Sequence, residues 1–186
     1  MANYAMSVDL TTCVACDACV IACKEENNVP DGYSRDWTEQ YLSGEFPNLS
    51  LELFSNRCQH CSNAPCVAAC PTKASYITED GLVLIDRDKC VECKHCVVAC
   101  PYGARYHFPG RWVDKCSFCD HRIGTGRSTA CVEVCPTRSL MFGDLDDPNS
   151  EISKAIKNRK YKLLKENERT KPKFFLLSST IERKTI

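Results

Sequence analysis

The sequence predicts an α+β fold made of two small cysteine-rich modules, one inserted in the other, with loop-rich extensions and a C-terminal helix and tail. Three observations support this prediction. Sixteen of the 186 residues are cysteine, the cysteines fall into four groups of four, and the strand-like segments beside them are short. Without cysteine, the apolar share falls from 44% to roughly 35%, which is a thin core for this length. Bound metal is therefore expected to help hold the chain together.

The four groups account for every cysteine in the chain. The first has the spacing C-x2-C-x2-C-x3-C and comprises Cys13, Cys16, Cys19 and Cys23. The second has the spacing C-x2-C-x4-C-x3-C-P and comprises Cys58, Cys61, Cys66 and Cys70. The third repeats the first spacing, adds a proline, and comprises Cys90, Cys93, Cys96 and Cys100. The fourth has an eleven-residue insertion before its third cysteine and comprises Cys116, Cys119, Cys131 and Cys135.

Three kinds of cysteine chemistry compete to explain these groups. Disulfides suit small secreted domains, but the start of the chain lacks the basic and apolar regions of a secretion signal. Structural zinc takes four ligands, often as two C-x2-C pairs held apart by a loop, whereas three groups here have consecutive runs. The run C-x2-C-x2-C-x3-C-P is the bacterial ferredoxin signature for a [4Fe–4S] cluster, and its repetition favours iron–sulfur chemistry. Covalent haem is excluded because no C-x2-C is followed by His.

The spacing within a group has a chemical reason. The first three cysteines lie on a tight loop, where their thiolates can bind three corners of one cube. The fourth cysteine follows on a short helix and binds the other cluster of the pair. The proline after it ends that helix. Cys23 is followed by Lys24 instead, so the first group must end differently.

The inserted module is expected over residues 50–104 and contains the second and third groups. Asp80 and Gly81 lie between two short apolar segments and predict a β-hairpin there. The outer module is expected from residues 1–49 together with 105–147. The first and fourth groups can therefore pair only across the insertion.

Two further elements are predicted in the outer module. The alternating apolar residues of segment 4–10 predict a strand entering the first group. Pro109 and Gly110 predict the turn of a hairpin that leads into the fourth group.

Two extensions accompany the modules. Residues 24–49 are rich in Asn, Asp, Glu, Pro and Gly and are expected to form a surface excursion with little regular structure. The C-terminal extension is expected over residues 148–186. It should contain a helix over 150–168 capped by Ser150, and the stretch KFFLLSS that follows is interpreted as an edge strand or a docking tail.

Composition and motifs limit the functions that are possible. The formal net charge is zero, so nothing indicates binding to nucleic acid. No apolar stretch reaches the roughly 18 residues of a membrane span, and no secretion signal is expected. The sequence has no phosphate-binding glycine loop, nucleotide fingerprint or Ser/His/Asp set, so the chain is expected to carry no catalytic residues of its own.

At this point the sequence resembles a known family. The order of the four groups and the phrases CKEENNVP, CPTKASY, CPYGARY, KCSFCDHRI and FGDLDDP are similar to the four-cluster iron–sulfur electron-transfer subunit of molybdopterin oxidoreductases of the dimethyl sulfoxide reductase family. The resemblance is strongest to the polysulfide and thiosulfate reductase or respiratory arsenate reductase types. It covers residues 4–178.

The resemblance implies four [4Fe–4S] clusters with crossed ligation. Cube 1 would be held by Cys13, Cys16, Cys19 and Cys135, cube 2 by Cys116, Cys119, Cys131 and Cys23, cube 3 by Cys58, Cys61, Cys66 and Cys100, and cube 4 by Cys90, Cys93, Cys96 and Cys70. In the family, cube 1 faces a molybdopterin-containing catalytic subunit. Cube 4 faces an integral membrane anchor that binds quinone.

The resemblance also implies a role. The chain would relay single electrons between the anchor and the catalytic subunit of an anaerobic respiratory reductase, without spanning the membrane itself. Its expected location is the membrane, through these partners, on the periplasmic face, with a cytoplasmic-face complex as the alternative. A free soluble polyferredoxin that shuttles electrons is the alternative function, although the 24–49 excursion and the C-terminal extension argue against it.

Charge balance points to residues around the ligands. Four oxidised cubes with their thiolates would bring roughly eight negative charges into a neutral chain, and nearby cations and N–H groups are expected to offset them. Candidate cations next to ligand cysteines are Arg57, Lys73, Lys89, Lys94 and Lys115, with ordinary surface charges as the alternative. The histidines, His60, His95, His107 and His121, are expected to be structural or surface residues because each cysteine group is already complete.

Overall fold

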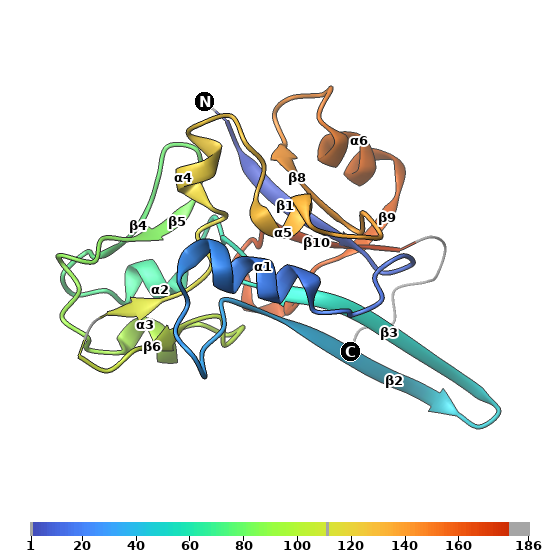
Figure 1. Cartoon of the computed structure of the whole chain (residues 1–186), viewed down its shortest axis with the longest axis horizontal. Helices are drawn as coiled ribbons and strands as arrows, with labels where there is room; N and C mark the ends of the chain where they lie inside the picture. The colour runs from blue at the N-terminus through green and yellow to red at the C-terminus, as the bar shows by residue number, and fades with distance from the viewer. Residues whose placement is uncertain (1, 111, 179–186) are drawn as a thin grey trace.

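The computed structural model describes residues 2–110 and 112–178. The chain is a mixture of short helices and short strands (Figure 1). The helices are α1 Ala18–Asn27, α2 Pro65–Ala68, α3 His95–Val98, α4 Asp120–Ile123, α5 Ala130–Glu133, α6 Glu151–Asn158 and the 3-10 turn η1 Glu166–Glu168. The strands are β1 Tyr4–Asp9, β2 Asp36–Glu45, β3 Asn48–Arg57, β4 Ser75–Ile77, β5 Val83–Ile85, β6 Tyr106–His107, β7 Val113–Asp114, β8 Leu140–Asp144, β9 Lys160–Lys162 and β10 Phe174–Ser178.

The largest sheet joins the two ends of the described chain. Its strand order is β8–β1–β10–β9, with β1 and β10 parallel and the other neighbours antiparallel. The alternating segment predicted to be a strand is confirmed as β1. Phe174 and Leu176 of β10 are fully buried beside Met6 and Val8 of β1, where they form the centre of the main core. The prediction that the KFFLLSS stretch forms an edge strand or a docking tail is therefore wrong, since β10 lies inside the sheet.

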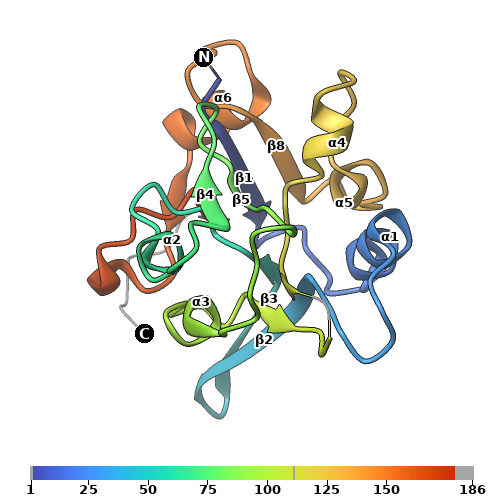
Figure 2. The ribbon, with the colours of Figure 1, turned by 90° about the vertical axis from the view of Figure 1, so that its left-hand side faces the viewer.

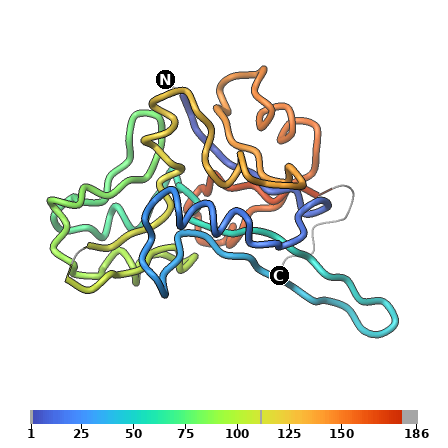
Figure 3. Tube along the Cα trace, viewed as in Figure 1, coloured from blue at the N-terminus to red at the C-terminus, as the bar shows by residue number. Residues whose placement is uncertain are grey.

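The expectation of little regular structure over residues 24–49 is also wrong. Helix α1 continues to Asn27, and β2 and β3 form a long hairpin whose register runs from Asp36 opposite Arg57 to Glu45 opposite Asn48. The hairpin stands away from the rest of the chain (Figures 1 and 3). Gly44 has φ +90°, and a Cβ there would lie 2.2 Å from a backbone oxygen, so the hairpin turn requires glycine at this position. In the sequence alone, this glycine instead indicates a loop.

The helix expected over 150–168 is shorter than predicted. Ser150 does cap it, since its Oγ accepts a hydrogen bond from the Ser153 N–H at 3.2 Å. The helix ends at Asn158 because Arg159 takes an extended conformation, its guanidinium bonds both oxygens of Asp9, and the chain continues into β9 of the main sheet.

Two small hairpins confirm predictions made from turn residues. Strands β4 and β5 pair on either side of Asp80 and Gly81, and strands β6 and β7 pair on either side of Pro109 and Gly110. In Figure 2 the helices α2 and α3 lie beside β4 and β5, whereas α1 and α5 lie together on the opposite side. Within the described residues, no helix combines the length and apolarity that a membrane crossing needs.

The central position of β10 can be tested by truncating a buried side chain. Leu176→Ala should lower the midpoint of thermal unfolding, followed by circular dichroism under argon, because loss of a fully buried leucine typically costs about 2–5 kcal/mol. Leu42→Ala is the matched control, since Leu42 is 68% exposed on the hairpin. Equal shifts for the two variants would contradict the assignment of β10 to the core.

Candidate iron–sulfur cluster sites

Two hollows in the structure bring together cysteines that are far apart in the sequence. One is lined by Cys70 together with the first three cysteines of the third group, which is the ligand set expected for cube 4. The other is lined by Cys23 together with the first three cysteines of the fourth group, the set expected for cube 2. In both, the single cysteine comes from a different group than the other three, as crossed ligation requires.

The ligand set expected for cube 3 is also close together. The thiol of Cys61 lies near enough to Cys58, Cys66 and Cys100 for their charges to act on it. Helix α2, which carries Cys66, packs against α3. Helices α1 and α5 pack in the same way in the other half of the chain.

The ligands expected for cube 1 are brought together by the main sheet. Val8 of β1 pairs with Leu140 of β8. Val8 lies five residues before Cys13, and Leu140 lies five residues after Cys135. The same offset occurs around the ligands expected for cube 4, where Ile85 pairs with Ser75 in the β5–β4 hairpin. Ile85 lies five residues before Cys90, and Ser75 lies five residues after Cys70. Strand pairing thus sets the approach of the two groups in both places.

The loops that carry the first three cysteines repeat an unusual backbone conformation. Ala15 and Asp17 in the first group, and Glu92 and Lys94 in the third, all have positive φ, at the second and fourth residues after the leading cysteine. Such conformations are uncommon for residues other than glycine. Their recurrence at matching positions indicates that both loops wrap around something of the same shape.

The second and fourth groups share the first of these positions, and a left-handed residue three positions after the last cysteine is common to the second, third and fourth groups. His60 and Phe118, each two residues after the leading cysteine, have φ +42° and +57°. Lys73 and Arg138, each three residues after the last cysteine, have φ +56° and +51°. The first and third groups are therefore matched in both spacing and backbone geometry, whereas the left-handed residue two positions after the leading cysteine recurs in all four groups.

Exposure differs along the expected series of cubes. Cys16 and Cys93, from the sets expected for cubes 1 and 4, are exposed, whereas all four cysteines expected for cube 2 and three of the four expected for cube 3 are buried. Among residues 2–110 and 112–178, no three His, Cys, Asp or Glu side chains converge closely enough to hold a single metal ion. A cube does not need such convergence, because each thiolate binds a different iron atom.

Burial disfavours the charged, thiolate form of the inner cysteines. It raises the pKa of Cys61 and of Cys116 to about 12. At neutral pH these groups are neutral thiols until a metal replaces the proton, so loading would release protons. Cys70 is less deeply placed: burial acts in the opposite direction, but hydrogen bonds from the Ser75 N–H and from Thr72 lower its pKa.

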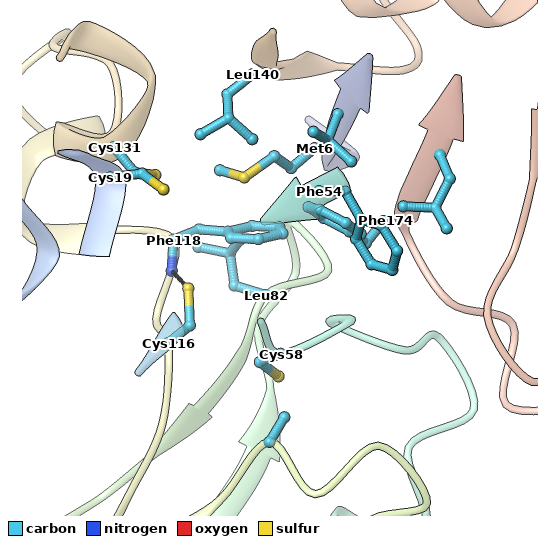
Figure 4. Packing of buried hydrophobic residues seen from close by; sticks show 13 residues of the cluster. Met6, Cys19, Phe54, Cys58, Leu82, Cys116, Phe118, Cys131, Leu140 and Phe174 are labelled. Atoms are coloured by element: carbon cyan, nitrogen blue, oxygen red, sulfur yellow. Dashed lines mark hydrogen bonds between the residues drawn. The ribbon is translucent and has the colours of Figure 1, made fainter. Parts of the chain in front are cut away.

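Two buried arginines donate directly to ligand sulfurs. Arg57 is fully buried and its Nη1 lies 2.8 Å from Cys131 Sγ. Arg105 is 5% exposed and its Nη2 lies 3.0 Å from Cys66 Sγ. A backbone donor is visible in Figure 4, where the Phe118 N–H lies 3.4 Å from Cys116 Sγ. The site is therefore arranged to stabilise negative charge on sulfur.

The candidate cations divide into buried and exposed residues. Arg57 and Lys115 are buried, and the Lys115 ammonium donates to the Cys116 carbonyl at 2.7 Å and to the Val83 carbonyl. The other three are exposed: Lys73, Lys89 and Lys94. Arg105 was missed by sequence reasoning because it lies five residues beyond the nearest cysteine. The one sequence feature that could have indicated it is its position shortly after Cys100 and Pro101, which end the third group.

His60 has a structural role between the two halves of the chain. Its ring stacks on Phe118 with centroids 3.7 Å apart. Nδ1 accepts from the Val83 N–H, which leaves Nε2 to donate to the Cys116 carbonyl, both at 3.1 Å. Burial, followed by the nearby Lys115 charge, lowers the pKa of His60 well below its usual value, so the ring is neutral at pH 7.

The remaining histidines lie at or near the surface. His107 contacts Glu92 and His121 contacts Glu26, each at 2.8 Å, and His95 is exposed.

Comparison with known proteins agrees with this geometry. Residues 49–145 match the family described as a 4Fe-4S dicluster domain. A polysulfide reductase chain of Wolinella succinogenes is 44% identical over 179 residues, which cover 94% of this chain and 94% of that protein. The thiosulfate reductase electron transfer subunit PhsB of Salmonella typhi is 45% identical, covering 83% and 81%. A tetrathionate reductase subunit of Salmonella typhimurium is 40% identical, covering 94% and 72%.

Fold, cysteine placement and similarity together define a 4Fe–4S dicluster protein of the ferredoxin-like class. Within that class, this protein belongs to the iron–sulfur subunits of the molybdopterin oxidoreductase family.

Crossed ligation predicts which cysteine variants share a spectroscopic effect. Cys23→Ser and Cys119→Ser should alter the same electron paramagnetic resonance signal of the dithionite-reduced protein, because both residues line the cube 2 hollow. Cys16→Ser and Cys135→Ser should together alter a different signal. If Cys23→Ser and Cys16→Ser affected one common signal, each group would bind its own cluster and the crossed assignment would be wrong.

Proposed function

We propose that this chain relays single electrons through four [4Fe–4S] clusters between a quinone-binding membrane anchor and a molybdopterin catalytic subunit of an anaerobic respiratory reductase. The observation that carries the proposal is the pair of hollows, each lined by three cysteines of one group and a fourth from another. When bound, the clusters would supply reversible one-electron storage. The chain's own side chains would hold them, shield them from water and stabilise their charge.

The proposed architecture is two ferredoxin-like modules, one inserted in the other. The matched strand registers around cubes 1 and 4, and the left-handed residues that recur in the cysteine loops, support an internal duplication. The first module would comprise residues 1–49 and 105–147, and the second residues 50–104. The C-terminal extension would complete the first module, because β10 is hydrogen-bonded along β1.

A series of four cubes with exposed ends suits a relay. The exposed ligands belong to cubes 1 and 4, and the ligands of cubes 2 and 3 are largely buried. Electrons would therefore enter and leave at the two ends and remain shielded between them. The relatives are named as one chain or subunit of a reductase, and these names support partner subunits for this chain as well.

The β2–β3 hairpin supports a fixed place in a complex over a free shuttle. Its outer half exposes several large apolar side chains, and Phe46 near the tip is 89% exposed. Exposed apolar surface of this kind marks sites of protein contact. The base of the hairpin is tied to the first cysteine group, because Thr38 Oγ1 donates to Asp17 at 2.9 Å and the hydroxyl of Ser55 contacts Cys19 Sγ at 3.2 Å.

The hairpin therefore stands beside cube 1, the end expected to face the catalytic subunit. We place the chain at the membrane through its partners, on the periplasmic face.

Metal content is the experiment that tests the proposal. The protein purified intact under argon should contain about sixteen iron atoms per chain, four for each cube. Native purification should recover a large molybdenum-containing subunit with it. Stoichiometric zinc, or two or fewer iron atoms, would refute the cluster assignment. Sixteen iron atoms in a chain that persistently purifies alone would favour the shuttle.

The direction of the series can be tested at cube 4. Cys93→Ser should slow quinone-linked turnover of the complex, because Cys93 is a ligand of the cube expected nearest the anchor. Reduction of the catalytic subunit by an artificial dye should be affected much less, since that route bypasses cube 4. Equal losses in the two assays would contradict the proposed order of the cubes.

A further inference from the structure

Arg57 and Arg105 make similar contacts in the two halves of the chain. Their positions relative to the cysteines differ, since Arg57 directly precedes Cys58 and Arg105 follows Cys100 by five residues. Both side chains are buried, both donate to a ligand sulfur, and both also contact a serine hydroxyl. The Nε atom of each is buried and has no hydrogen-bond partner among the described residues. A guanidinium in such a place is costly unless a strong negative charge faces it.

The contacts of Arg57 reach two cubes at once. Its Nη1 donates to Cys131 of cube 2 at 2.8 Å, and its Nη2 donates to Ser55 Oγ. That hydroxyl in turn lies 3.2 Å from the sulfur of Cys19, a ligand of cube 1. Cys19 and Cys131 lie next to each other in Figure 4. The arginine therefore lies between the sulfur ligands of cubes 1 and 2.

The contacts of Arg105 repeat this arrangement for cubes 3 and 4. Its Nη2 donates to Cys66 of cube 3 at 3.0 Å, and its Nη1 donates to Ser75 Oγ at 2.8 Å. The backbone N–H of Ser75 lies 3.4 Å from the sulfur of Cys70, a ligand of cube 4. The charge of the same guanidinium also acts on the thiol of Cys96, another ligand of cube 4.

An ordinary core ion pair does not account for the two arginines. Arg57 has a carboxylate near it, but Asp36 Oδ2 is 3.6 Å from Nη1, farther than the sulfur. For Arg105, the charges that act most strongly on the guanidinium are the thiol groups of Cys66, Cys58 and Cys96. No ion pair joins Arg105 to a carboxylate of the described residues. In both cases the closest acidic group is the sulfur of an expected cluster ligand, which would become negative when a cluster is bound.

We propose that Arg57 and Arg105 are the residues that set the reduction potentials of the clusters, each for one pair: Arg57 for cubes 1 and 2, and Arg105 for cubes 3 and 4. The inference rests on the proposed function, because it assumes that the four cubes are bound.

The physical reason is electrostatic. Reduction adds one electron to a cube and no atoms, so a fixed positive charge beside its ligands favours the reduced state. Burial keeps that effect large, because neither water nor salt screens the charge. Each arginine bonds a ligand of one cube and reaches a ligand of the other through a serine, so the potentials of a pair are raised together and an electron can pass between them without a large uphill step.

The test is a potentiometric titration of the holoprotein, followed by electron paramagnetic resonance. In Arg57→Gln, the signals assigned to cubes 1 and 2 should both move to lower potential. The expected size is at least a tenfold fall in the reduced-to-oxidised ratio at a fixed potential, or about 59 mV for one electron. The signals of cubes 3 and 4 should stay in place. Arg105→Gln should give the reverse pattern.

The control is an exposed cation equally close to a ligand in the sequence. Lys94→Gln removes a charge next to Cys93, but Lys94 is exposed, so water screens it and the shift should be much smaller. Arg57→Lys keeps the charge and should shift the cube 1 and 2 signals by less than the glutamine variant. If a glutamine variant loses iron, the lysine variant tests the inference instead. Its ammonium cannot reproduce the bonds to both sulfur and serine, so the two signals of the pair should still move together to lower potential, by a smaller but measurable amount.

Two outcomes would overturn the inference. One is an unchanged pair of potentials in the arginine variants that retain their iron. The other is a shift as large in Lys94→Gln as in the buried variants. Either result, obtained on protein with about sixteen iron atoms and four reducible signals, would leave the proposed relay intact. Absence of iron from the unsubstituted protein would refute the relay itself.

Discussion

Convergence of cysteines from distant groups on shared sites is the constraint on which the rest of the structure depends. Residues 13–23 and 116–135 can share ligands only if β1 and β8 pair across the sheet, and residues 58–70 and 90–100 only if β4 and β5 form their hairpin. The helices between the cysteines are mostly one turn long and bury little apolar surface of their own. Ligation by metal would therefore supply cohesion that the apolar core of this cysteine-rich chain cannot provide alone.

Charge is the second organising feature, because clusters and thiolates are anions held inside a neutral chain. Buried cations offset this negative charge. Arg57 and Arg105 donate to cysteine sulfurs, and Lys115 donates to backbone carbonyls where the two halves meet. Buried Lys173 also lies near this contact and donates to the Gly81 carbonyl, and neutral His60 stacks on Phe118 there. One buried arginine thus lies within each pair of expected cubes, and two buried lysines lie beside the aromatic stack between the pairs.

Local sequence signals predicted those parts of the fold that depend on neighbouring residues. The Asp80–Gly81 and Pro109–Gly110 turns predicted the two small hairpins, whereas the sets that line both hollows were predicted by the family resemblance carried over onto the matching cysteines. The β2–β3 hairpin was missed because its outer residues are exposed on both faces, which removes the usual alternation. The position of β10 and the role of Arg105 depend on distant partners, so no local pattern could reveal them.

The central claim is that sixteen thiolates hold four separate cubes, and anomalous X-ray scattering at the iron edge tests it most directly. A crystal of the intact protein grown under argon should give four compact iron peaks, each enclosed by three cysteines of one group and a fourth from another. The peaks should form a series, with the Cys16 and Cys93 sets at its two ends. Fewer than four peaks, or peaks enclosed by four cysteines of a single group, would contradict this account.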